Sequence, residues 1–224
     1  MRDTIQHLTP DLHRSLFLRL AAVEPGVEEL WAMGNLQLLA SNQSAVLVDG
    51  ARASTAYGEH VATEFVRELA EDHTIITTGA FGIAAAAARA TLEAGFAPVI
   101  VLPSGLDVPF PSGNRDLFDQ ILERGGLILS PYPSERRPSR FSFMRRSQVA
   151  AHLADVTVVV EAGPRSPAVW TGAQAAAAGR TVAAVPGPIT SAMSKGCHTL
   201  IRDNGAHLVV SAAEISELVL TARQ

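Results

Sequence analysis

Short apolar runs alternate along this chain with longer segments whose apolar residues recur every three or four positions. The clearest example covers residues 156–187. An apolar, β-branched run at 156–160 is too short for a buried helix and predicts a strand buried on both faces. A Gly/Pro/Ser loop, an alanine-rich helix over 168–178 and a second apolar strand at 181–185 follow. This order of strand, helix and strand predicts a βαβ unit with parallel strands.

The same alternation continues over most of the chain and predicts a doubly wound, mostly parallel α/β sheet. Further strands are expected at 45–48, 74–77, 98–102, 127–129 and 206–210. Helices are expected at 57–69, 83–94, 114–124, 141–153, 196–201 and 212–221. In such sheets, ligands bind at the carboxyl ends of the strands.

The first 43 residues follow a different pattern. Thr9-Pro10-Asp11 is a typical helix start, and apolar residues recur at helical spacing over 12–20. A shorter helix is expected over 27–33. We therefore predict a small helical cap in residues 1–43 and an α/β domain in residues 44–224.

Composition excludes several classes of protein. The 224 residues carry a net charge of −4, so any nucleic-acid binding must come from a local basic patch. The single cysteine, Cys197, excludes an internal disulfide and a cysteine-based zinc site. The chain shows no apolar run of about 18 residues and no N-terminal apolar signal region, which predicts a cytoplasmic protein without a membrane span.

Four loops at the expected ligand edge consist of glycine and small residues placed before a helix. They lie at 50–54, 79–82, 163–166 and 187–196. Small residues let a ligand approach the backbone, and helix N-termini offer unpaired N–H groups to an anion. Together the loops favour a ligand that carries phosphate, although each alone is equally well explained as a tight turn. The motifs of nicotinamide or flavin dehydrogenases, P-loop NTPases, zinc proteases and serine hydrolases are absent.

Five arginines fall within eleven residues without an acid among them: Arg136, Arg137, Arg140, Arg145 and Arg146. The planar guanidinium group binds two phosphate oxygens at once, so phosphate contact is the favoured interpretation and a solvated loop the alternative. Phe141 and Phe143 either stack on bases or turn into the core.

Other reactive side chains suggest little chemistry. Asp107 and Glu161 are candidates for orienting a ligand hydroxyl or an arginine. His152 and His198 are interpreted as structural, and no base accompanies Cys197 in the sequence to make it a nucleophile. No metal or cofactor is expected.

Several motifs follow one another in the order found in the DNA-processing protein A (DprA/Smf) family, which this chain resembles. They are GARASTAYG at 50–58, TGAFGI at 78–83, LPSGLD at 102–107, VVVEA at 158–162, VPG at 185–187 and GCHTLI at 196–201. The resemblance implies an extended Rossmann-like domain that binds single-stranded DNA, forms a homodimer and helps to load a recombinase. It implies no catalytic activity.

Loops, arginines and resemblance together predict the residues that contact DNA or phosphate. These are Arg52, Ser54, Gly79, Ala80, Gly82, Arg140, Arg145, Arg146, Ser166, Thr171, Lys195 and Gly196. The chain departs from the family pattern in carrying Phe81 and Gln148 where arginines are usual, and Ala84 where an aspartate is usual. It also lacks the family's common C-terminal winged-helix-like extension, so we expect a divergent, minimal member.

Two alternatives use the same fold. In the first, the altered loops bind a small nucleotide-derived ligand instead of a strand. In the second, the protein is an N-glycosidase acting on nucleoside monophosphates. The second is disfavoured because residues 161–166 lack the glutamate that related enzymes carry in a P-G-G-x-G-T-x-x-E pattern.

Overall fold

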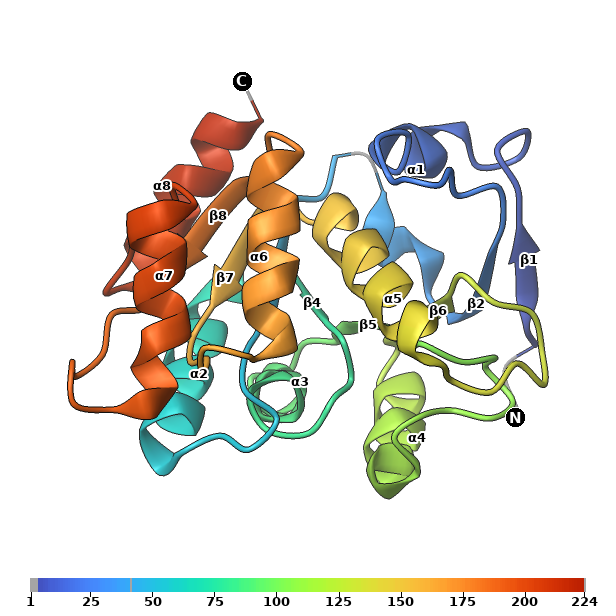
Figure 1. The fold of residues 1–224 in the computed structure, drawn as a ribbon. Coiled ribbons are helices and arrows are strands. Elements are labelled where there is room, and N and C mark those ends of the chain that lie inside the picture. Colours follow the sequence, from blue (N-terminus) through green and yellow to red (C-terminus); the bar gives the residue numbers. More distant parts are fainter. Residues whose placement is uncertain (1–3, 41, 224) are drawn as a thin grey trace.

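A single nine-stranded sheet runs through the molecule in the order β1-β2-β6-β5-β4-β3-β7-β8-β9 (Figure 1). The structure is a computed structural model and describes residues 4–40 and 42–223. The strands are β1 Gln6–Leu8, β2 Leu30–Gly34, β3 Ala45–Asp49, β4 Thr74–Thr77, β5 Val99–Val101, β6 Leu127–Ser130, β7 Val156–Val159, β8 Thr181–Ala184 and β9 His207–Leu208. The helices are α1 Arg14–Arg19, α2 Ala56–Leu69, α3 Ile83–Glu93, α4 Arg115–Glu123, α5 Arg140–Leu153, α6 Pro167–Ala177, α7 Lys195–Asp203 and α8 Ala212–Ala222.

The strands from β3 onward are mutually parallel, which confirms the predicted α/β class. β3 pairs with β4 on one side and with β7 on the other. The chain builds outward from β3 through β4, β5 and β6, and then returns to add β7, β8 and β9 on the opposite side. The strand order therefore reverses between β3 and β7, and the loops after these strands diverge there.

Helices cover both faces of the sheet. On one face, α1, α5, α6 and α7 pack over a core that includes Leu47, Val101 and Val159. On the other face, α2, α3 and α8 cover Val48 and Val158, and α4 closes the end next to β6. The central strands are buried along their whole length, which explains why they are continuous apolar runs.

The N-terminal segment differs from the predicted helical cap. Its described residues contain one short α-helix, α1, and a 3₁₀ helix at Leu36–Leu39, but residues 30–34 form strand β2 where a helix was expected. β2 pairs antiparallel with β6, and β1 pairs antiparallel with β2. Leu30 and Ala32 are buried between less buried neighbours, an alternation that is typical of a strand. As a strand, β2 also provides hydrogen-bond partners for the backbone groups at the edge of β6. Residues 1–3 and 41 of the predicted cap lie outside the described residues.

No helix in the described part of the chain is long and apolar enough to cross a membrane.

Candidate nucleic-acid interface

The loops that follow β3 and β4 touch through their backbones. The amide of Ile83 donates a hydrogen bond of 3.1 Å to the carbonyl oxygen of Ala51. Gly82 has a φ of +72°, and a Cβ at this position would lie 2.1 Å from the Ala51 oxygen. A glycine is therefore required at residue 82. The contact holds Arg52, which is exposed, beside the glycine loop at 79–82.

Arg146 lies beneath this pair of loops. Its side chain is only 3% exposed and donates a hydrogen bond of 3.1 Å from Nη1 to the carbonyl oxygen of Thr78. Burial lowers the pKa of Arg146 to about 10, against the attraction of the buried carboxylate of Asp49. Burial also raises the pKa of Asp49, and the charge of Arg146 opposes that rise. In this conformation Arg146 supports the loop from below and leaves almost no surface for a ligand.

Phe143 on α5 packs against two of the predicted arginines. The guanidinium carbon of Arg52 lies 5.2 Å from the centroid of the Phe143 ring, and that of Arg146 lies 5.5 Å from it. These distances are within the range of cation–π attraction. The ring of Phe110 meets Phe143 edge-on, with centroids 5.6 Å apart. Phe143 therefore links the first loop to α5, and its ring is already engaged by protein groups.

The N-terminal turn of α5 presents further positive charge to solvent. Ser139 caps the helix in a reciprocal capping box with Ser142, and Arg140, the first helical residue, is exposed. The preceding proline-rich loop carries Arg136 and Arg137, which are also exposed. Asp107 braces this loop, because its carboxylate accepts hydrogen bonds of 2.8 and 2.9 Å from the amide of residue 135.

Arg145 and Ser54 have protein partners of their own. Arg145 donates from Nη1 to the carbonyl oxygen of Pro25 and from Nη2 to that of Gly26, the second bond measuring 2.5 Å. It thereby ties α5 to the N-terminal segment. The hydroxyl of Ser54 donates a bond of 2.6 Å to a carboxylate oxygen of Glu59 in the first turn of α2.

A buried carboxylate occupies the point where the strand order reverses. Glu161, 5% exposed, follows β7. Its two oxygens accept hydrogen bonds of 2.9 and 2.8 Å from the amide and hydroxyl of Thr55, the N-cap of α2. Gly58 leaves room for this carboxylate, since a Cβ there would lie 2.4 Å from it. The N-terminus of α2 therefore already holds an anion, and the predicted phosphate site at this helix end is filled by the protein itself.

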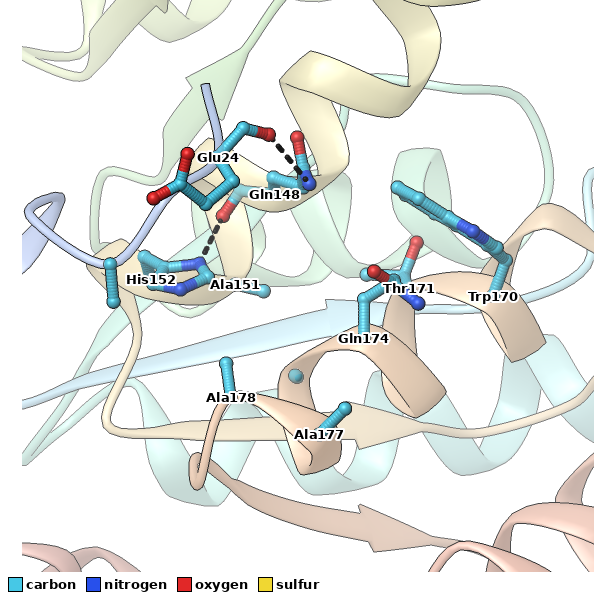
Figure 2. Close-up of a pocket in the computed structure, with 11 residues that line it drawn as sticks. Glu24, Gln148, Ala151, His152, Trp170, Thr171, Gln174, Ala177 and Ala178 are labelled. Carbon is cyan, nitrogen blue, oxygen red and sulfur yellow. Dashed lines mark hydrogen bonds between the residues drawn. The ribbon is translucent and has the colours of Figure 1, made fainter. Parts of the chain in front are cut away.

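The predicted residues on α6 are also internally satisfied. The Ser166 hydroxyl caps α6 by accepting a bond of 3.4 Å from the amide of Ala168. Thr171 is buried and donates a bond of 3.1 Å to the carbonyl oxygen of Pro167. Thr171 lines a cleft of about 210 Å³ between α5 and α6, together with Gln148 and Trp170. Figure 2 shows this cleft, which is on the face of the sheet and not at the glycine loops.

The start of α7 packs closely on the loop after β7. Gly196 donates a bond of 2.8 Å to the carbonyl oxygen of Ala162, and a Cβ at residue 196 would lie 2.6 Å from that oxygen. Lys195, next to it, is exposed. His198 donates from Nε2 to the carbonyl oxygen of Gly187 at 2.9 Å, in agreement with its predicted structural role. Cys197 is fully buried, and burial raises its pKa to about 12, so it is a poor nucleophile.

The structure thus brings some of the predicted residues together and separates others. Arg52 is exposed and Gly82 is half-buried where the two loops meet, with Arg146 beneath them. Gly79 and Ala80, which were also predicted to contact DNA, are buried. Arg145 instead binds carbonyl groups of the N-terminal segment, and Thr171 binds the carbonyl group of Pro167 within α6. Sequence reasoning did not single out Asn114, the residue before α4, whose side chain donates a bond of 3.0 Å to the carbonyl oxygen of Gly79 and fixes the glycine loop. An asparagine before a helix has many uses, so the sequence carried no specific signal for this contact.

Within residues 4–40 and 42–223, no group of three or more His, Cys, Asp or Glu side chains is arranged to hold a metal ion.

Comparison with known proteins identifies the family. The profile of the DNA recombination-mediator protein A family matches residues 15–220. The chain belongs to the DprA family. It is 47% identical to a putative DNA processing protein DprA of Mycobacterium tuberculosis (strain CDC 1551 / Oshkosh) over 191 residues, which is 85% of this chain and 49% of the relative. It is 36% identical to the DNA processing protein DprA of Streptococcus pneumoniae (strain ATCC BAA-255 / R6) over 186 residues, covering 83% and 64% respectively. The chain spans about half the length of the mycobacterial relative.

Solved structures agree with this assignment. DprA from Streptococcus pneumoniae superposes with a TM-score of 0.87 at 32% identity, covering 96% of this chain and 74% of that one. DprA from Helicobacter pylori, described by its unique single-stranded DNA binding mode, superposes with a TM-score of 0.84 and covers 99% of each chain. The latter is 22% identical, so it supports the DprA fold of this chain and no more.

Proposed function

We propose that this chain binds single-stranded DNA along the carboxyl ends of β3, β4 and β5, without catalysing a reaction, in DNA processing during recombination or DNA uptake. The observation that carries the proposal is the backbone contact between Gly82 and Ala51, which sets exposed Arg52 beside a glycine loop. An exposed guanidinium group held at a fixed position is suited to contact a phosphodiester chain. Membership of the DprA family supports the same conclusion.

The exposed arginines supply the charge in this proposal. Arg52 faces solvent beside the glycine loop and Arg140 at the start of α5, and Arg136 and Arg137 in the loop before α5 are also exposed. Arg145 and Arg146 act as supports, because backbone carbonyl groups already accept their hydrogen bonds. The direct phosphate contact predicted for Arg146 is replaced here by a positioning role.

Binding without catalysis is supported by the state of the candidate reactive groups. The Cys197 thiol is buried with a pKa raised to about 12. The Glu161 carboxylate is engaged by Thr55. A single buried, reduced cysteine also fits the cytoplasmic location that we propose.

Fluorescence anisotropy with a labelled oligonucleotide tests the proposal. We expect binding that weakens with salt at a log–log slope of about −0.7 per phosphate neutralised. Replacing Arg52 and Arg140 together by alanine should make the slope shallower by about 1.4, the sum for two contacts. Arg14→Ala, at an exposed position on α1, is the matched control and should leave the slope unchanged. Absence of oligonucleotide binding by the wild type at low salt would overturn the proposal.

A small nucleotide is the alternative ligand for the same edge of the sheet. Mononucleotides that displace the oligonucleotide at low concentration, or that raise the melting temperature when the oligonucleotide does not bind, would favour this alternative. A ligand present at a hundredfold its dissociation constant adds about 2.7 kcal/mol of stability.

We also propose that the chain forms a homodimer and contacts a recombinase, as its family membership implies. β9 is a two-residue edge strand, and Leu208 on it and Val210 after it are 54% and 61% exposed. Edge strands with exposed apolar residues readily pair with a second copy. Light scattering should give twice the chain mass for the wild type, and Leu208→Lys should shift the equilibrium toward the monomer. A wild-type monomer at high concentration would contradict this arrangement.

A further inference from the structure

Phe81 is an exposed aromatic side chain within one of the predicted ligand-binding loops. It lies in the glycine loop between β4 and α3, and 48% of its surface is open to solvent. Most aromatic side chains of this size contribute to a core. The ring instead lies over the backbone of Gly113, where a Cβ would be 3.1 Å from its outermost carbon. Because Gly113 has no side chain, the Phe81 ring can lie against its backbone while the rest of the ring faces solvent.

The surroundings of Phe81 combine apolar and positive groups. Phe110 and Val108, in the loop that leads to Gly113, are 38% and 37% exposed. Phe110 contacts Phe143, and Phe143 contacts Arg52. Gly82, the residue after Phe81, packs on the backbone of Ala51 and Arg52. Exposed aromatic rings that alternate with guanidinium groups along a groove are typical of surfaces that hold unpaired bases.

We propose that Phe81 is a base-stacking residue that makes this chain select strands with unpaired nucleobases; this inference rests on the proposed function. Phe143 is less suited to the task, because Arg52, Arg146 and Phe110 already engage its ring. Phe141 is 79% exposed but lies on α5, whereas Phe81 lies within the glycine loop next to the Gly82–Ala51 contact. Phe81 carries no charge, so it adds affinity through contact with the base and not through the phosphate. Duplex DNA hides its base faces in the stack and cannot make this contact.

Two strands of equal length and charge separate this contribution from phosphate binding: a thymidine 15-mer and a 15-mer of abasic tetrahydrofuran residues. Wild type should bind the thymidine strand about tenfold more tightly, which equals about 1.4 kcal/mol and falls within the range of one base–aromatic stack. Phe81→Leu should abolish this difference by weakening only the thymidine complex. Phe81→Lys should also lose base selectivity, but should steepen the salt slope by about 0.7.

Phe96 offers a matched control. It is 40% exposed and follows the end of α3, whereas Phe81 lies just before the start of the same helix. Phe96→Leu should leave binding of both strands unchanged. Phe81→Trp should retain base selectivity, and its added fluorescence should be quenched by the thymidine strand and not by the abasic strand.

The possible failures are distinguishable. If the wild type binds both strands equally well, or if Phe81→Leu weakens both to the same extent, the stacking role is overturned and the proposed function stands. If the wild type binds neither strand, the proposed function fails and the stacking role fails with it.

Discussion

The edge of the sheet has two halves that look alike in sequence and differ in structure. Over β3, β4 and β5, the glycine loops leave Arg52 and Phe81 exposed. Over β7 and β8, the polar groups are used internally: Glu161, after β7, reaches across to Thr55 at the N-terminus of α2, and His198 binds Gly187. A glycine-rich loop before a helix is therefore insufficient evidence for an anion site. What decides is whether another part of the chain already occupies the helix end.

The largest loss of stability should come from removing Arg146, which lies beneath the loops that follow β3 and β4. Arg146→Met leaves the carboxylate of Asp49 buried without its nearby positive charge, which should cost about 3–5 kcal/mol of unfolding free energy in urea titrations. Asp49→Asn introduced into this variant should restore part of the loss. A cost below about 1 kcal/mol would show that this charge pair does not support the loop.

The same variant has a predictable pH dependence. Burial raises the pKa of Asp49 in the folded state, so the folded chain holds this proton more tightly than the unfolded chain. Stability from this group is therefore lost as the pH rises from its unfolded pKa of about 3.9 through its folded pKa. Without Arg146 to oppose the rise, the loss in Arg146→Met should extend to higher pH than in the wild type.

The next largest loss of stability should come from disrupting the contact between Gly82 and Ala51, which joins the loops after β4 and β3. Gly82→Ala places a Cβ 2.1 Å from the Ala51 oxygen in addition to the strain of a φ of +72°. We expect a cost of about 3 kcal/mol, of which the left-handed backbone accounts for about 1–2. Gly95→Ala is the control, because its φ is +88° and nothing lies within 4 Å. It should show only the backbone cost in thermal unfolding, and equal costs at both sites would contradict the loop contact.

A smaller effect should come from freeing the N-terminus of α2, which follows β3 and is occupied by Glu161 from the loop after β7. Glu161→Gln removes the charge at the N-terminus of α2 but keeps an acceptor for Thr55, at a cost of about 1–2 kcal/mol in stability. Affinity for single-stranded DNA at low salt should rise about threefold, the size of one weakly screened charge contact. Glu68→Gln, at the exposed far end of α2, is the control and should change neither quantity. Unchanged or weaker DNA binding by Glu161→Gln would show that Glu161 does not exclude an anion from this helix end.

Cys197 should have the smallest effect on DNA binding. Burial raises the pKa of its thiol to about 12, so iodoacetamide at pH 8 should alkylate the native protein more than about a hundredfold more slowly than the unfolded protein. Cys197→Ala should leave DNA affinity unchanged. Rapid alkylation of the native chain would mean that α7 does not close over the end of β7.

Sequence patterns predicted the parallel part of the fold because its strands are short apolar runs bounded by glycine and its helices are longer and periodic. They missed β2, because five residues containing a tryptophan and a methionine fit a helix as well as a strand. Only the unpaired edge of β6 resolves this ambiguity, and that edge is about a hundred residues away in the chain. The domain boundary at residue 43 stays a prediction.

The sequence predicted which residues belong to the candidate site, but it did not predict which of them face solvent and which contact other parts of the chain. Arg52, Gly79 and Gly82 were identified from loop composition and from the resemblance to DprA proteins. The different fates of Arg140, Arg145 and Arg146 were not, although all three lie in one helix within seven residues. One is exposed, one reaches backbone carbonyl groups in the N-terminal segment, and one is buried under the glycine loop.

The sequence alone determined the strand–helix alternation, the positions of the small-residue loops and the family, because these depend on residues close together in the chain. The tertiary structure decided which helix ends are free, which arginines face solvent and which aromatic rings are left uncovered. Those outcomes depend on hydrogen bonds between residues that are distant in the chain, such as Glu161 and Thr55. They also depend on whether a charged side chain is buried or exposed to water.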